Sequence, residues 1–171
     1  MNQKTNNAEE TVAQLIQQHN ESMASEIIKE VVQFPFAKFY STIGYVMKCL
    51  KYWHDNNHTR LESLGQNSFG GIVKRDPLGL LEVYIEAMKV PSDQEIGETE
   101  LASFIDRMKK KKVQQGVFIT TSFFKKDIQV ENGIVLIDGK KLSEYMVEFN
   151  AGTKVKTVYV WRDLDRSFIN L

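Results

Sequence analysis

Two short runs of this sequence are apolar at almost every position, and they constrain the fold more than any other feature. Residues 116–121 read Gly-Val-Phe-Ile-Thr-Thr, and residues 134–137 read Ile-Val-Leu-Ile. Strands of a parallel sheet are covered on both faces, so they lack the alternation of a half-exposed strand. We therefore predict that both runs are buried strands of one sheet in an α/β fold.

A hairpin supplies the antiparallel part of the predicted sheet. Residues 70–75 and 81–88 have strand character, and the Asp76-Pro77-Leu78-Gly79 segment between them is typical of a turn. The period of two in the second strand separates its side chains onto two faces. One face carries Val83, Ile85 and Ala87, and the other carries Glu82, Tyr84, Glu86 and Met88. We expect a helix over 99–112 to cross from this hairpin to the strand at 116–121.

Helical spacing of apolar residues predicts the remaining elements. We expect two N-terminal helices between Ala8 and Gln33, broken at residues 19–22 with Ser22 as an N-cap. A third helix, from Pro35 to about Trp53, is apolar over most of its surface and should pack on the sheet. A short helix at 122–129, an amphipathic helix at 141–150 and a last strand at 156–161 complete the prediction. Residues 1–33 would form an N-terminal helical arm, and residues 34–171 the main domain.

Composition limits the class of protein. The chain has 171 residues, 42% of them apolar, which is enough for one hydrophobic core without disulfides or metals. No apolar run approaches the length of about 18 residues that a membrane helix needs, and residues 1–11 lack the apolar segment of a secretory signal. Cys49 is the single cysteine, which excludes an intramolecular disulfide and a cysteine-based zinc site. These features lead us to expect a cytoplasmic protein without a membrane partner.

The distribution of charge leaves the partner open. Lys and Arg number 22 against 22 Asp and Glu, so the basic excess typical of dedicated nucleic-acid binders is missing. Basic pairs nevertheless occur at 74–75, 109–112, 125–126 and 140–141. Our DNA-contact candidates are Lys74, Arg75, Lys89, Lys125 and Lys126. If the basic groups converge on one face they favour DNA contact, and if they scatter they favour a protein partner.

The hairpin contains part of a nuclease-like pattern. Metal-dependent nucleases place a carboxylate near one strand, and an acidic residue followed two positions later by lysine on the next strand. Here Glu86 occupies the acidic position, but Met88 stands where the lysine would share its face, and Lys89 falls on the opposite face. His54 and His58 lie four residues apart with no third metal ligand evident. We therefore predict neither a bound metal nor another cofactor, unless the site has migrated and holds Mg²⁺.

Several ordered segments together resemble the catalytic domain of the Mrr-type restriction endonucleases, bacterial enzymes of the PD-(D/E)xK superfamily that cut modified DNA. The matching segments are 76–80, 83–87, 116–122 and 134–142, followed by Tyr145-Met146, Phe149-Asn150 and the tail 160–168. The resemblance covers residues 25–170. It implies a restriction-endonuclease-like core, a mixed central sheet flanked by helices, with extra N-terminal helices. Residues 1–33 are expected to be too short for the winged-helix domain that often precedes this catalytic domain.

The same resemblance also marks departures from the family pattern. The family's metal-binding Asp falls at Gly70, its Gln/Glu-x-Lys triplet is Glu86-Ala87-Met88, and its helical glutamate is replaced at or near Tyr40. We therefore expect an impaired nuclease that can still bind DNA in a restriction or defence setting. Two alternatives stay open: an active Mg²⁺-dependent endonuclease with a displaced site, and a protein-interaction module. Restoring Gly70→Asp and Met88→Lys is expected to rebuild part of the site.

Overall fold

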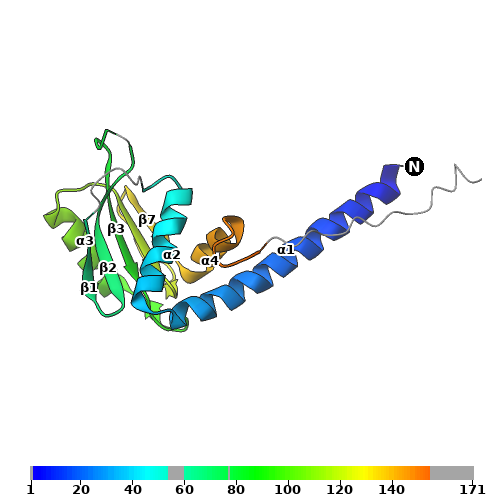
Figure 1. Ribbon diagram of the computed structural model, residues 1–171, viewed down its shortest axis with the longest axis horizontal. Coiled ribbons are helices and arrows are strands. Elements are labelled where there is room, and N and C mark those ends of the chain that lie inside the picture. Colours follow the sequence, from blue (N-terminus) through cyan, green and yellow to red (C-terminus); the bar gives the residue numbers. More distant parts are fainter. Residues whose placement is uncertain (1, 54–59, 77, 155–171) are drawn as a thin grey trace, which may run out of the picture.

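The computed structural model describes residues 2–53, 60–76 and 78–154, and the side chains within 11–53, 61–76 and 78–154. Its central five-stranded sheet has the order β1-β2-β3-β5-β7 (Figure 1). These strands are β1 (Arg60–Gly65), β2 (Ser68–Lys74), β3 (Glu82–Met88), β5 (Gly116–Thr120) and β7 (Ile134–Ile137). The first three are antiparallel, whereas β3, β5 and β7 run parallel. The predicted mixed sheet and its hairpin are confirmed.

The described residues form four helices, α1 (Asn2–Gln33), α2 (Phe36–Cys49), α3 (Glu98–Lys110) and α4 (Gly139–Glu148). The crossover from β3 to β5 is α3, as predicted. A second, two-stranded sheet pairs β4 (Glu95–Ile96) with β6 (Phe123–Phe124). Figure 1 shows α1 extending far from the rest of the described chain. Within the described residues, no helix has the length and apolar character that crossing a bilayer requires.

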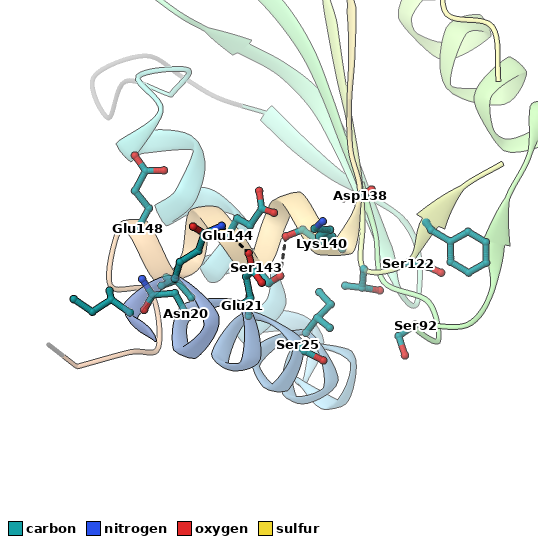
Figure 2. A pocket seen from close by; sticks show the side chains of 18 of the residues that line it. Asn20, Glu21, Ser25, Ser92, Ser122, Asp138, Lys140, Ser143, Glu144 and Glu148 are labelled. Carbon is teal, nitrogen blue, oxygen red and sulfur yellow. Dashed lines mark hydrogen bonds between the residues drawn. The ribbon is translucent and has the colours of Figure 1, made fainter. Parts of the chain in front are cut away.

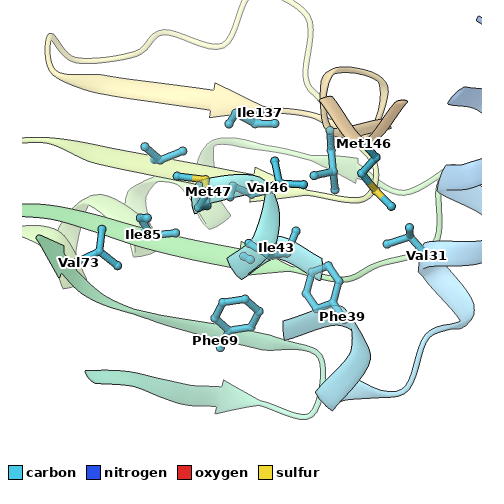
Figure 3. Packing of buried hydrophobic residues seen from close by; sticks show 14 of the residues in the cluster. Val31, Phe39, Ile43, Val46, Met47, Phe69, Val73, Ile85, Ile137 and Met146 are labelled. Atoms are coloured by element: carbon cyan, nitrogen blue, oxygen red, sulfur yellow. The ribbon is translucent and has the colours of Figure 1, made fainter. Parts of the chain in front are cut away.

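Two apolar clusters hold the helices against opposite faces of the sheet. The larger cluster joins α1, α2 and α4 to the face that carries Val83, Ile85 and Ala87 (Figure 3). Phe39, Ile43, Val46 and Met47 project from α2 into this cluster and are buried, as the spacing predicts. The smaller cluster joins α3 to the other face through Tyr84, Phe104 and Phe118, with Phe104 and Phe118 stacked at 5.0 Å between ring centroids. The two-face division of β3 is therefore confirmed.

The prediction of a broken N-terminal helix pair is wrong, because α1 is continuous through residues 19–22. No Gly or Pro occurs between residues 2 and 33, and the Gln17 side chain donates a 3.0 Å hydrogen bond to Glu21 across the expected break. The prediction of a helix at 122–129 is also wrong. This segment contains the short strand β6, which follows β5 closely and pairs with β4.

Two further expectations need correction. The run at 134–137 is a strand, but β7 is the last strand of the described sheet, and its Val135 side chain is 49% exposed. An apolar run alone does not distinguish a central strand from a terminal one. In addition, α2 ends at Cys49 rather than Trp53, so Leu50 is its C-cap and is half-buried, as is Cys49. The predicted strand at 156–161 and both His54 and His58 lie outside the described residues.

Candidate functional site

Glu86 is the retained acidic residue of the nuclease-like pattern, and the structure buries it almost completely. Glu86 is 1% exposed and lies within β3. The side chain points toward α3, because Glu86 alternates with Ile85 and Ala87, which belong to the opposite cluster. A buried carboxylate requires a charged partner or several hydrogen bonds to remain ionised.

That partner is Arg107 of α3. Its Nη2 donates to Glu86 Oε1 at 2.6 Å, and its Nε donates to Glu86 Oε2 at 2.9 Å. This two-point geometry is the strongest arrangement available between a guanidinium and a carboxylate. The hydrogen bonds with Glu86 raise the pKa of Arg107 above its usual value. Both carboxylate oxygens are therefore engaged by a fixed positive charge.

Tyr84 closes the remaining side of Glu86. The Tyr84 hydroxyl lies 3.4 Å from Glu86 Oε2 and donates a weak hydrogen bond to it. Burial and the nearby Glu86 charge raise the pKa of Tyr84 to about 12. The phenol therefore stays neutral and can act as a donor at neutral pH.

Gly70 stands directly opposite Glu86 in the antiparallel pair of β2 and β3, at the position where the family pattern has its Asp. The space above Gly70 is already filled. A Cβ atom there would lie 2.9 Å from the Tyr84 hydroxyl, 3.0 Å from Leu64 Cδ1 and 3.1 Å from the Ile85 carbonyl oxygen. An Asp at position 70 therefore needs a shift of the Tyr84 and Leu64 side chains. The expectation that Gly70→Asp and Met88→Lys rebuild part of the site stays a prediction.

The structure leaves Met88 beside Glu86 but places Tyr40 and Lys89 away from it. Met88 shares its face, as the period of two requires, and packs against the cluster under α3. Tyr40 lies on the other side of the sheet, where its ring centroid is 4.8 Å from that of Phe69. The Lys89 ammonium donates a hydrogen bond to the carbonyl oxygen of Phe34, a residue in the connection between α1 and α2. Tyr40 and Lys89 therefore do not join Glu86 in one site.

Asp76 and Glu82, the carboxylates considered for a migrated site, are also placed elsewhere. Asp76 accepts hydrogen bonds from the amides of Leu78 at 3.0 Å and Leu81 at 2.5 Å. The Leu81 bond is the main reason that the pKa of Asp76 is lowered. Glu82 is exposed at the start of β3. Asp76 thus stabilises the hairpin turn.

The residues around Glu86 do not fit a divalent metal. Mg²⁺ is held by carboxylate oxygens, and Glu86 is the single carboxylate here, with both of its oxygens bound to Arg107. A guanidinium beside the carboxylate would repel a second cation. Across the described side chains, no three His, Cys, Asp or Glu residues gather as a metal-binding group.

The basic groups are distributed over the two ends of the sheet. Lys74, Arg75 and residues 109–112 lie at the end formed by the β2–β3 turn and the start of β5. Lys89, Lys125, Lys126 and residues 140–141 lie at the end where the parallel strands finish.

Several of these basic side chains already have partners. Lys109 and Lys110 pair with Glu131 and Asp106 at 3.1 and 2.7 Å. Lys125 and Lys141 pair with Glu98 and Glu144, both at 3.2 Å. The Arg75 guanidinium lies over the Tyr52 ring, 4.6 Å from its centroid. The described basic groups therefore do not form one continuous patch.

Arg107 is the functional-site residue that sequence reasoning missed. It lies 21 residues from Glu86, so no local spacing connects the two. One signal was present. Leu101, Phe104 and Met108 form the buried stripe of α3, and Arg107 stands three residues after Phe104 beside that stripe. An arginine beside the buried face of a helix indicates an ion pair when the strand under that helix carries a buried glutamate.

Comparisons with known proteins agree with this fold. In sequence, the chain is 28% identical over 152 residues to the Type IV methyl-directed restriction enzyme EcoKMrr of Escherichia coli (strain K12), covering 86% of this chain and 49% of that enzyme. It thus spans about half the length of that relative. In structure, it resembles the DNA modification-dependent restriction endonuclease AspBHI, with a TM-score of 0.54 and 16% identity over 78% of this chain and 36% of that one.

A second solved structure, MspJI restriction endonuclease in complex with a 27-mer oligonucleotide, gives a TM-score of 0.49 at 19% identity, over 77% of this chain and 33% of that one. The decisive finding is the family model. The model of the restriction endonuclease catalytic domain of Mrr type matches residues 36–146, from the start of α2 into α4. The chain therefore belongs to the Mrr-type restriction endonuclease family.

Proposed function

We propose that this Mrr-type domain no longer cleaves DNA and serves as a non-catalytic binding component of a cytoplasmic DNA restriction system. The observation that carries the proposal is the Arg107–Glu86 ion pair. The single acidic group of the family motif has both oxygens hydrogen-bonded to a guanidinium within 2.9 Å, so a metal ion would have to compete with Arg107 for this carboxylate. Without a metal ion and the lysine of the family pattern, the site lacks the two groups with which metal-dependent nucleases activate the attacking water.

Three neighbouring features support the same conclusion. Gly70 has no carboxylate to offer, and the Tyr84 hydroxyl fills the space that one would use. Met88 replaces the lysine on the Glu86 face with an apolar side chain. A displaced site is disfavoured because Lys89 reaches the Phe34 carbonyl on the far side of the sheet.

A protein-binding role is the second candidate, and the arrangement of the basic groups favours it. DNA affinity grows with the number of phosphates that lysine and arginine neutralise together. Here the basic groups lie at two ends of the sheet, and several are paired with carboxylates. Family membership favours DNA as the partner, so we retain DNA binding as the first candidate.

The test of lost cleavage is incubation with methylated and unmethylated plasmid in Mg²⁺ and in Mn²⁺. We expect no nicked or linear product from the wild-type chain. Clear cleavage that Glu86→Gln abolishes would overturn the proposal, since it would show a working site at this carboxylate. Glu82→Gln is the matched control, because it changes an exposed glutamate on the same face of β3.

A reconstruction series tests the reason for the loss. We expect the Gly70→Asp/Met88→Lys double variant to remain inactive, because Arg107 and Tyr84 still occupy the surroundings of Glu86. Adding Arg107→Gln and Tyr84→Phe removes the guanidinium and the hydroxyl. Metal binding to the fourfold variant, measured by calorimetry, would then exceed that of the double variant. Equal metal binding by both would contradict the blocking role of the ion pair.

A further inference from the structure

A groove of about 1030 Å³ lies between α1 and α4 (Figure 2). Its lining is mostly apolar, and the side chains of Ile16 and Phe123 in that lining are 46% and 43% exposed. Ala24, Ile28 and Val147 belong to the same lining. Large apolar side chains that stay open in one groove mark an interaction surface.

The rim of this groove is acidic. Four carboxylates line the groove, those of Glu21, Asp138, Glu144 and Glu148, against the single ammonium of Lys140. Two of the four have partners within α4, because Asp138 accepts a hydrogen bond from the backbone of that helix and Glu144 pairs with one of its lysines. Glu21 and Glu148 are exposed and form no salt bridge with any described side chain. The groove therefore favours an apolar occupant with positive charge.

The described chain ends beside this groove. Glu148 lines the groove and ends α4, and Lys154, the last described residue, follows six positions later. In Figure 1 and Figure 2 this end of the chain leaves α4 on the side where α1 lies. Helix α4 is about 15 Å long at 1.5 Å per residue, whereas eight extended residues reach about 26 Å. Residues 155–162 are therefore long enough to run along the groove.

The sequence that follows the described chain matches the groove in both apolar character and charge. Residues 154–162 read Lys-Val-Lys-Thr-Val-Tyr-Val-Trp-Arg, with three basic residues and no Asp or Glu. The apolar side chains can cover Ile16 and Phe123, and the basic ones can pair with the open carboxylates of the rim. Because the segment is tethered to α4, its effective concentration at the groove is on the order of millimolar, so weak contacts suffice to hold it.

The edge of β7 is the competing place for the same segment, since β7 is the terminal strand of the described sheet. Such an edge offers backbone hydrogen bonds. Its residues Ile134–Ile137, however, carry no charge that could pair with basic side chains. The groove offers an apolar surface and carboxylates together, so the observations favour it.

We propose that residues 155–162 dock in the groove between α1 and α4 of their own chain, with Lys156 and Arg162 paired to the carboxylates of its rim. The segment then contacts both helices. It therefore fixes α1 to the nuclease-like domain along the part of that helix that lines the groove, from Ala13 to Ile28.

The test is disulfide trapping in the full chain, with Cys49→Ser removing the native thiol. The test pair is Asn20→Cys/Val158→Cys, because Asn20 is exposed and lines the groove. Ser22→Cys/Val158→Cys is the matched control, since Ser22 is exposed on α1 about 200° around the helix from Asn20. We expect the test pair to form its disulfide within one chain at least tenfold faster than the control, as followed on non-reducing gels at high dilution.

Three results would overturn the proposal. Equal rates for the Asn20 and Ser22 pairs would show that the segment does not occupy the groove. Faster closure by Val135→Cys/Val158→Cys would place the segment at the edge of β7, where Val135 is exposed. Disulfides that form only between chains would show that the groove takes the segment of another copy.

Charge reversal tests the acidic rim. Lys156→Glu/Arg162→Glu, added to the Asn20 test pair, should slow disulfide formation at least fivefold, because the segment then repels Glu21 and Glu148. Lys156→Gln/Arg162→Gln removes the charge alone and should give an intermediate rate. Adding Glu21→Lys/Glu148→Lys to the reversed segment should restore the rate to within twofold. An unchanged rate after reversal, or no recovery after the exchange of charges, would contradict the pairing of this segment with the rim.

Discussion

At the scale of single residues, the site is governed by the energetics of one buried charge. Burying a carboxylate is costly unless a partner compensates it, so Glu86 and Arg107 must be considered as one unit. Glu86 is 1% exposed, while the Arg107 side chain is 34% exposed, so the guanidinium remains partly in water. Removing Arg107 therefore costs more than the pair itself contributes, because the carboxylate is left without its partner.

We predict that Arg107→Ala lowers the free energy of unfolding by about 2–3 kcal/mol, below the 3–5 kcal/mol typical of fully buried pairs because Arg107 is partly exposed. Urea denaturation at neutral pH measures this. The Arg107→Met/Glu86→Gln double variant should recover most of the loss, since it removes both charges together. If the double variant is as unstable as Arg107→Ala, the stranded charge is not the cause.

A pH dependence follows from Tyr84. Its pKa is raised to about 12 in the folded chain, whereas an unfolded tyrosine ionises near 10. A raised folded-state pKa gives stability that is fully present below about pH 10 and is lost as the pH rises toward 12. We predict that the wild type loses up to about 2–3 kcal/mol more than Tyr84→Phe over this interval. Urea midpoints measured from pH 9 upward test this, and parallel curves for both proteins would contradict it.

The sequence located three members of this site without its central interaction. Glu86 and Met88 could be placed on one face because a strand has a fixed period of two, whereas Gly70 was located by the resemblance to the family pattern. The Arg107 contact depends on how α3 crosses the sheet, and the closed space over Gly70 depends on the rotamer of Tyr84. Neither is encoded in local spacing, so only the folded chain shows that Glu86 is paired with Arg107.

At the scale of secondary structure elements, α2 shows where sequence patterning is reliable. Its apolar residues at 39, 43, 46 and 47 follow the helical period, and all four are buried. The patterning failed at the ends of elements and at α1. Polar residues at 19–22 suggested a break, but helix-compatible residues without Gly or Pro propagate a helix regardless of polarity. The edge position of β7 depended on topology, which an apolar run does not reveal.

We predict that Ile43→Ala lowers the free energy of unfolding by about 2–5 kcal/mol, through lost apolar burial and the cavity left between α2 and the sheet. Ile43 is 0% exposed at the centre of the larger cluster (Figure 3). Ser41→Ala, an exposed change on the same helix, should stay within about 0.5 kcal/mol. Chemical denaturation of both variants gives the comparison. A loss below that of the control would place α2 outside the cooperative core.

At the scale of the whole molecule, the fold is that of a nuclease while its charges are arranged differently from those of a strong DNA binder. The sequence predicted the architecture because the hairpin, the crossover helix and the two apolar strands follow one another in the order of this fold, each with the hydrophobic period of its element. It could not predict where the basic groups meet, since residues 74–75 and 125–126 are brought to opposite ends by strand direction. Because these basic groups lie at opposite ends of the sheet, few of them can contact the same DNA duplex, and this limits the affinity that the described chain can have for DNA.

This geometry gives a quantitative expectation for DNA binding. Because three of the four lysines at 109–112 lie near carboxylates, at 2.7–3.8 Å, either end of the sheet offers few cations to one duplex. About three neutralised phosphates give a slope of about −3 for log Kobs against log salt concentration. Gel-shift titrations between low and moderate salt measure the slope. We expect Lys125→Glu/Lys126→Glu and Lys109→Glu/Lys110→Glu to differ in effect, since one duplex does not contact both ends. A slope steeper than about −6, weakened equally by both pairs, would instead establish one extended DNA surface.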